Sequence, residues 1–144
     1  MKIKNFRHVG IVTTNLKKSL QFYEDILGLK KIKIINENQK LMNKILGLKK
    51  CNLKTVKLGL NRKIFLELLY FKNFNQKRKY IKIFSPGLTH FSITVKNLDK
   101  LYYDLKTKKI KFISEPSLSN NNKVKLAFCK SPENIFIELV EIVK

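Results

Sequence analysis

The sequence has no tryptophan, only two cysteines and only ten acidic residues among its 144 residues. Cys51 and Cys129 stand alone, without the paired spacing of a zinc finger or a redox motif, so we expect reduced, small apolar side chains. No apolar run approaches the roughly 20 residues that a membrane helix needs, which excludes a membrane-spanning helix. The opening MKIKNFR has no apolar signal core, so we expect a cytoplasmic protein.

Positive charge dominates the composition, because 31 Lys and Arg residues face 10 Asp and Glu residues, for a net charge of +21. Only three of the basic residues are arginines, and 14 asparagines accompany the lysines, a bias that an AT-rich genome would impose. The lysines are scattered and do not form one stripe with interleaved aromatic residues. We therefore expect no nucleic-acid partner and no membrane partner, while an anionic small substrate stays compatible with the excess charge.

The chain contains two copies of one pattern. The segment HVGIVTTNL at 8–16 aligns with HFSITVKNL at 90–98, with His, Ile, Asn and Leu in register. The segment IFLEL at 64–68 aligns with IFIEL at 135–139 in the same order. Two ordered matches indicate a duplicated structural unit. We expect one domain over 1–144, built of module 1 (1–72) and module 2 (86–144) joined by a linker at 73–85.

Each copy has the pattern of a strand, a helix and three further strands, which predicts an α+β fold of two βαβββ modules. The expected helices share leucine and tyrosine stripes at helical spacing, and they cover 16–27, with a stop at Gly28, and 98–105. A shorter amphipathic helix or lid is expected around 41–46. The expected strands are rich in β-branched and apolar residues: 8–12, 29–35, 53–60, 64–71, 88–95, 110–113, 124–130 and 135–142.

The only two histidines, His8 and His90, occupy equivalent positions in the repeat, as do Glu67 and Glu138. A histidine or a glutamate alone in a strand is usually a hydrogen-bonded or solvated residue. Here each glutamate lies in an otherwise apolar strand, where an unpaired charge costs several kcal/mol. Neither strand has a Lys or Arg in its central stretch, so a divalent metal would satisfy all four groups. Nitrogen and oxygen donors without thiolate suit Zn, Ni, Co, Mn or Fe.

The sequence resembles the vicinal oxygen chelate superfamily, which includes glyoxalase I, methylmalonyl-CoA epimerase and extradiol dioxygenases. The segments that carry the resemblance are RHVGIV (7–12), NLKKSLQFYEDILGL (15–29), IFLEL (64–68), GLTHF (87–91) and SPENIFIEL (131–139). The resemblance implies paired βαβββ modules whose mixed sheets curl around a metal cleft, with one divalent ion held by His8, Glu67, His90 and Glu138. Many relatives have DPDGN at the last turn, where this chain has SPEN, a structural change that removes no ligand.

The resemblance also implies a chemistry. A metal bound to substrate oxygens stabilises an enolate, while Glu67 or Glu138 shuttles the proton. This predicts a lyase or isomerase of the glyoxalase I or methylmalonyl-CoA epimerase type, acting on a small carbonyl compound or a thioester.

Two alternatives stay open. If Glu67 is not a ligand, two histidines and one glutamate would suit an extradiol-type dioxygenase with iron. The second alternative is a non-catalytic ligand-sequestering protein of the same fold. Members of the superfamily commonly form homodimers, and the spacing does not say whether one chain or two supply each site.

Overall fold

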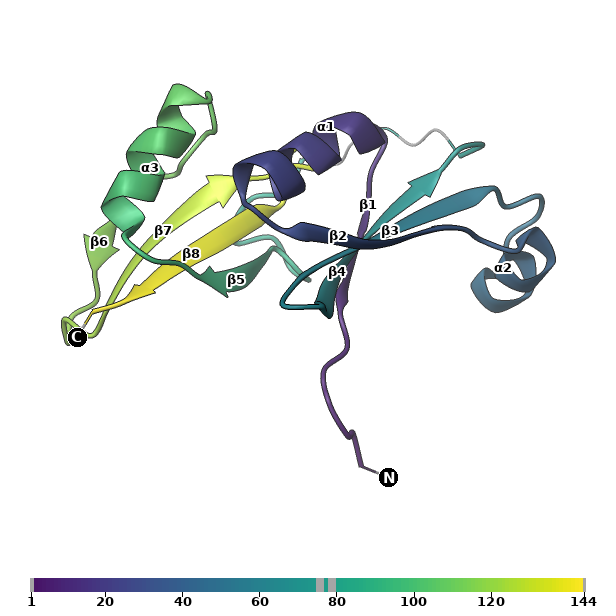
Figure 1. Ribbon diagram of the computed structural model, residues 1–144, viewed down its shortest axis with the longest axis horizontal. Coiled ribbons are helices and arrows are strands. Elements are labelled where there is room, and N and C mark those ends of the chain that lie inside the picture. Colours follow the sequence, from purple (N-terminus) through teal and green to yellow (C-terminus); the bar gives the residue numbers. More distant parts are fainter. Residues whose placement is uncertain (1, 75–76, 78–79, 144) are drawn as a thin grey trace. The chain divides into compact units, whose positions relative to one another are not determined.

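The computed structural model describes residues 2–74, 77 and 80–143 (Figure 1). The chain divides into two compact units, Met1–Lys77 and Arg78–Lys144. Part of the predicted linker, residues 75–76 and 78–79, lies outside the described residues, so the predicted module boundaries stay a prediction.

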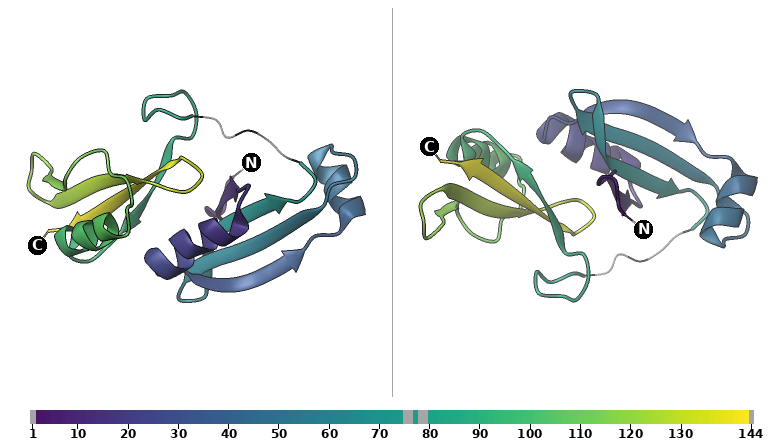
Figure 2. Two further views of the ribbon diagram at one scale, coloured as in Figure 1. Left: turned by 90° about the horizontal axis from the view of Figure 1, so that it is seen from above. Right: turned by 90° about the horizontal axis from the view of Figure 1, so that it is seen from below.

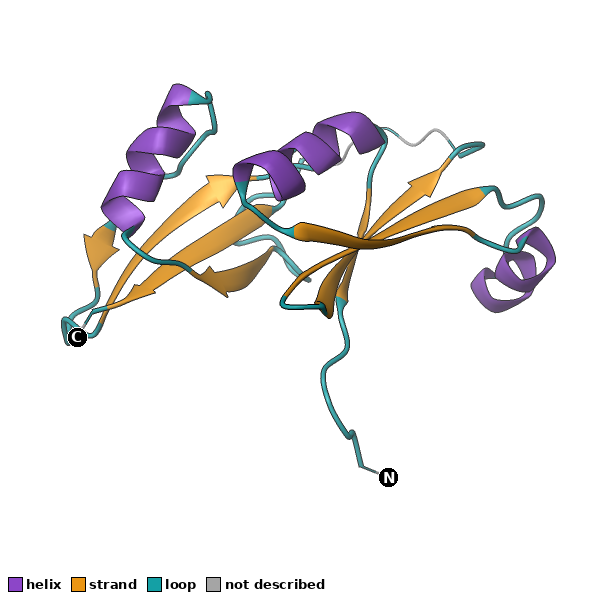
Figure 3. Cartoon of the chain, viewed as in Figure 1, coloured by secondary structure: helices purple, strands orange, loops and turns teal. Residues whose placement is uncertain are grey.

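Unit 1 contains one four-stranded mixed sheet. Its elements in chain order are β1 (Val9–Val12), α1 (Leu16–Leu20), the π-helical segment η1 (Gln21–Ile26), β2 (Lys30–Asn36), α2 (Gln39–Leu46), β3 (Leu53–Leu60) and β4 (Lys63–Phe71). The strands lie in the order β1-β4-β3-β2, with β1 parallel to β4 and the other pairs antiparallel. Figure 3 shows α1 and η1 lying as one continuous helix over a face of this sheet.

Local signals explain the first helix. The Asn15 side chain caps α1 by accepting a hydrogen bond of 3.0 Å from the Lys18 N–H, and Gly28, with φ of 77°, follows the helix. The predicted helix at 16–27 is therefore confirmed, with a π-helical second half. Phe22 and Tyr23 from that half are buried, and so are Leu66 and Leu68 of β4, which share one face of the sheet.

The predicted short helix is also confirmed, as α2. The Asn38 side chain accepts from the Leu41 N–H at its start, and Gly47 ends it in a left-handed conformation. Its Met42 is buried with Cys51 and Leu53. Figure 2 shows α2 at one end of the long strands β2 and β3.

Unit 2 repeats the topology. Its elements are β5 (His90–Thr94), α3 (Leu98–Thr107), β6 (Ser117–Leu118), β7 (Val124–Lys130) and β8 (Phe136–Ile142). The strand order is β5-β8-β7-β6, with β5 parallel to β8. At the start of α3, the Glu141 carboxylate accepts hydrogen bonds of 3.0 Å from the Asn97 N–H and 2.9 Å from the Leu98 N–H. These bonds satisfy free backbone N–H groups at a helix end that favours negative charge.

One predicted strand is wrong. Residues 110–113 make only a single bridge to β7, between Phe112 and Cys129, and the strand that pairs with β7 is β6 at Ser117–Leu118. Between the Phe112–Cys129 bridge and the Ser117–Leu126 pair, this segment has two more residues than β7, so a regular ladder cannot continue from Phe112 into β6.

The fold class is confirmed: two open, four-stranded mixed sheets with helices form an α+β protein. Within the part of the chain that the structure describes, no helix is long and apolar enough to cross a membrane.

Candidate metal centre

Unit 1 brings His8 and Glu67 together. His8 directly precedes β1, and the parallel register of β1 with β4 sets Gly10 beside Glu67, so alternation places both side chains on one face of the sheet. His8 Nε2 lies 3.4 Å from Glu67 Oε2. The Glu67 side chain is 11% exposed and that of His8 is 30% exposed, so the carboxylate is the more buried member of the pair.

A third residue, Lys57, reaches the same carboxylate. In the antiparallel register of β3 with β4, Lys57 is the partner of Glu67, and its Nζ lies 2.7 Å from Glu67 Oε1. The two oxygens of Glu67 therefore face different groups, Oε1 the ammonium and Oε2 the imidazole. The sequence predicted that Glu67 needs a metal as its cation, because its own strand has no Lys or Arg in its central stretch. The structure instead supplies a cation from the neighbouring strand, at Lys57.

A bulge explains why the lysine was missed. With the predicted turn at Asn61-Arg62, a regular hairpin would set residue 57 opposite residue 66, on the other face from Glu67. The register instead shifts between Leu58 and Gly59, because Phe65 is an extra residue on β4. That shift by one residue places Lys57 opposite Glu67.

Two buried polar atoms on this face have no hydrogen-bond partner among the described residues. One is Glu67 Oε1, whose contact with Lys57 is close enough for an ion pair but lacks the angles of a hydrogen bond. The other is the hydroxyl of Thr55, two residues before Lys57 on β3 and thus on the same face. Buried polar atoms are normally satisfied, so this face retains capacity to bind a ligand.

Unit 2 places His90 and Glu138 on neighbouring strands in the same manner. The register sets His90 beside Phe136 and Ser92 beside Glu138, so His90 and Glu138 share a face. The Nδ1 atom of His90 lies 3.1 Å from the Thr89 hydroxyl, which leaves Nε2 for a ligand. Such a contact from the other ring nitrogen is the usual support of a metal-binding histidine.

The two units differ at one matched position. Opposite Glu67 stands Lys57, whereas opposite Glu138 stands Phe128, whose ring makes an edge contact with the ring of His90 at 5.4 Å between centroids. Glu138 is half-buried, and its carboxylate has no ion pair among the described residues. Within the described part of the chain, the fold thus supplies a cation to Glu67 but none to Glu138.

The pair in unit 1 fits a divalent ion. Two ligand atoms that each lie ~2.1 Å from a tetrahedral ion are separated by roughly 3.4 Å, which is the separation of His8 Nε2 and Glu67 Oε2. Imidazole and carboxylate are also donors that such ions accept. Among the residues that the structure describes, no three His, Cys, Asp or Glu side chains gather as a metal site. Neither unit therefore holds a complete site by itself, and the four-ligand set stays a prediction.

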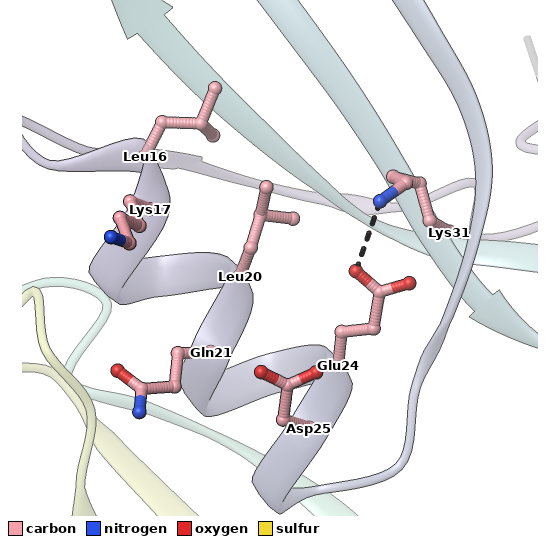
Figure 4. A pocket seen from close by; sticks show the side chains of 7 residues that line it. All are labelled: Leu16, Lys17, Leu20, Gln21, Glu24, Asp25 and Lys31. Atoms are coloured by element: carbon pink, nitrogen blue, oxygen red, sulfur yellow. Dashed lines mark hydrogen bonds and ion pairs between the residues drawn. The ribbon is translucent and has the colours of Figure 1, made fainter.

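A separate hollow lies in unit 1, beside its first helix (Figure 4). It is lined by residues of α1, η1 and β2: Leu16, Lys17, Leu20, Gln21, Glu24, Asp25 and Lys31. Lys31 Nζ lies 3.2 Å from Glu24 Oε2 across it. None of the four predicted ligands lines this hollow.

A duplicated βαβββ unit with a histidine and a glutamate at matched positions defines the class of protein. The chain belongs to the Glyoxalase/Bleomycin resistance protein/Dioxygenase superfamily, whose family model matches residues 5–139.

Particular relatives add detail. The chain is 28% identical to the lactoylglutathione lyase of Schizosaccharomyces pombe, over 97% of this chain and 48% of that protein, so it spans about half the length of the curated relative. The fold matches a glyoxalase family protein from Bacillus cereus with a TM-score of 0.88 at 18% identity, covering 100% of this chain and 97% of that one. It also matches the trypanothione-dependent glyoxalase I of Leishmania major with a TM-score of 0.65 at 20% identity, covering 96% and 87%.

Proposed function

We propose that this protein is a divalent-metal-dependent lyase or isomerase of the glyoxalase type, which acts on a small carbonyl compound or a thioester. The family supports the general class of chemistry. The observation that carries the metal site is the contact of His8 Nε2 with Glu67 Oε2 at 3.4 Å, together with the matched face of His90 and Glu138. In this proposal the four residues hold one ion.

The residues would divide the work as follows. The bound ion would polarise a substrate carbonyl and make the neighbouring proton easier to remove. Glu67 is engaged by both Lys57 and His8, whereas Glu138 has no ion pair among the described residues. Glu138 is therefore the carboxylate with a free oxygen to accept the substrate proton, and Glu67 has the more static role. The apolar rings of Phe128 and Phe136, which share the face of Glu138, would limit the access of water to that proton.

The substrate is argued from the relatives. The similarity to a lactoylglutathione lyase favours the hemithioacetal of glutathione and methylglyoxal as the first compound to assay. A coenzyme A thioester is the second, because a chain of net charge +21 suits its phosphates.

Metal analysis tests the site directly. The purified protein, dialysed against a divalent salt, is expected to retain about one divalent ion per chain by elemental analysis. Glu67→Ala and His90→Ala are each expected to lose it, because each removes a ligand. Glu115→Ala, which removes an exposed carboxylate from a loop, is the matched control and is expected to keep the metal. A wild-type protein that stays free of metal after reconstitution would leave a ligand-binding protein and end the catalytic proposal.

The contact of Lys57 with Glu67 favours a second candidate. If the lysine keeps Glu67 away from the metal, the remaining His8, His90 and Glu138 form a two-His-one-Glu set, which suits ferrous iron and an extradiol-type dioxygenase. In that case Glu67→Ala would retain the metal while His90→Ala would lose it. Catechol cleavage under oxygen would then be the assay to run first.

A further inference from the structure

We propose that Lys57 is a built-in replacement for the metal at Glu67, so that a divalent ion and the Lys57 ammonium compete for one carboxylate. This inference rests on the proposed function, because it takes Glu67 as a metal ligand. It concerns how tightly the site binds its ion.

The first argument is the burial of the carboxylate. The Glu67 side chain is 11% exposed and needs a positive partner to stay charged at that depth. Lys57 Nζ supplies one at 2.7 Å from Oε1, from the residue directly opposite on β3. The unit therefore compensates Glu67 without any metal.

The second argument is the comparison of the two modules. The position of Lys57 in unit 1 is filled by Phe128 in unit 2, where Glu138 has no ion pair with any residue that the structure describes. Since Lys57 and Phe128 each stand directly opposite one of the matched glutamates, the lysine is a feature of one half only. The competition is thus confined to Glu67.

The third argument is the relative size of two opposing effects. A partner on the second oxygen of a ligand carboxylate can orient it for the metal, which is worth roughly 10- to 100-fold in affinity. A full positive charge next to the same carboxylate also repels a dication, and at an effective dielectric constant of about 20 that repulsion is larger than the gain from orientation. Lys57 is 23% exposed, so its ammonium has a route to water when the metal arrives. The net effect of Lys57 is therefore to weaken metal binding at Glu67.

Zinc affinity tests the proposal. Metal-free wild type, Lys57→Met, Lys57→Arg and Lys54→Met are titrated with Zn²⁺ against a chromophoric chelator. Lys54 lies on the same strand but on the opposite face, so its replacement removes the same charge without touching Glu67. Lys57→Met is expected to bind Zn²⁺ at least ~10-fold more tightly than wild type. Lys54→Met is expected to stay within about twofold, and Lys57→Arg within about threefold, because it keeps the charge.

Thermal unfolding of the same proteins gives an independent readout. Without metal, Lys57→Met is expected to melt at a lower temperature than Lys54→Met, because Glu67 loses its ion pair with the Lys57 ammonium, and Zn²⁺ is expected to reverse the loss. Zinc affinity that is unchanged or weaker in Lys57→Met, or equal melting of the two metal-free variants, would overturn the role of Lys57 and leave the metal site standing. Absence of zinc binding in every protein would overturn the metal site as well.

Discussion

At the scale of single residues, the most consequential contact is the ion pair between Lys57 and Glu67. It joins two strands, so the sequence of either strand alone does not reveal it. Glu67 is buried, and its charge is balanced by a residue ten positions away, through a strand pairing. The same pairing in the other unit brings an aromatic ring instead, at Phe128. Two carboxylates in local sequences that differ at one position, IFLEL and IFIEL, therefore have different electrostatic surroundings.

Cys129 is a second residue whose surroundings set its chemistry. It lies fully buried near the end of β7, and burial raises the pKa of its thiol to about 12. Only the thiolate reacts with disulfide reagents, so we expect the folded protein to leave Cys129 unlabelled by a thiol reagent at pH 8. The Cys51→Ser variant isolates Cys129 for this measurement. Rapid labelling without denaturant would contradict the burial, whereas labelling in urea is the positive control.

The same pKa shift predicts a pH dependence of stability. In the unfolded chain the thiol loses its proton near pH 9, but in the folded chain it keeps it up to about pH 12. The unfolded state is therefore favoured as the pH rises through this window, and the protection is complete only below pH 9. We expect the free energy of unfolding of wild type to fall by about 1 kcal/mol more than that of Cys129→Ala between pH 8 and pH 10. Equal losses in urea titrations of the two proteins would contradict this expectation.

At the scale of elements, the hairpin of β3 and β4 determines the candidate site. Its bulge depends on Gly59, because a Cβ atom at that position would lie 1.9 Å from the carbonyl oxygen of Lys63. The close approach of the two backbones permits the extra residue Phe65 and the shifted register. The Lys57–Glu67 contact thus depends on Gly59, because this glycine permits the bulge that sets the register.

Gly59→Ala tests this dependence. The new methyl group must push the backbone of Lys63 away, so we expect a loss of about 2 to 3 kcal/mol in the free energy of unfolding, measured by urea denaturation. Gly10→Ala is the matched control, because its Cβ would make an ordinary contact of 3.5 Å with Leu69 and should change stability by less than ~0.5 kcal/mol. Equal losses in the two variants would show that the backbone approach at Gly59 does not matter.

Much of this architecture could be predicted from the sequence, because the repeat and the hydrophobic spacing specify the element types. The strand at 53–60 and the helices at 16–27, 41–46 and 98–105 are confirmed. The strand at 110–113 could not be corrected from spacing, because the single bridge at Phe112 depends on how the chain meets β7. The repeat predicted that His8 and His90 occupy equivalent positions, as do Glu67 and Glu138, and the set of four ligands stays a prediction. Lys57 was not, since only the bulge brings it to Glu67.

At the scale of the whole molecule, the excess of positive charge is the dominant electrostatic feature. A net charge of +21 repels itself in the folded state more than in the expanded chain. Salt screens this repulsion over a Debye length of about 10 Å at 0.1 M.

We therefore expect the melting temperature to rise by several degrees between 20 mM and 500 mM NaCl. A variant with four exposed lysines replaced by glutamine, at positions 40, 44, 108 and 123, should show a smaller rise. A melting temperature that falls with salt, or a rise of the same size in the variant, would contradict the role of self-repulsion. Differential scanning calorimetry gives the measurement for both proteins.

The pairing of the first and last strands within each sheet also bears on how the protein is made. β1 pairs with β4 and β5 pairs with β8, and every named strand pairing stays within one unit. A ribosome has released every strand of the first sheet once Phe71 has left the exit tunnel, while the first strand of the second sheet, which begins at His90, is still inside the tunnel. The first sheet can therefore form all of its strand pairings during translation. None of its strands has to stay unpaired until the second unit has been made.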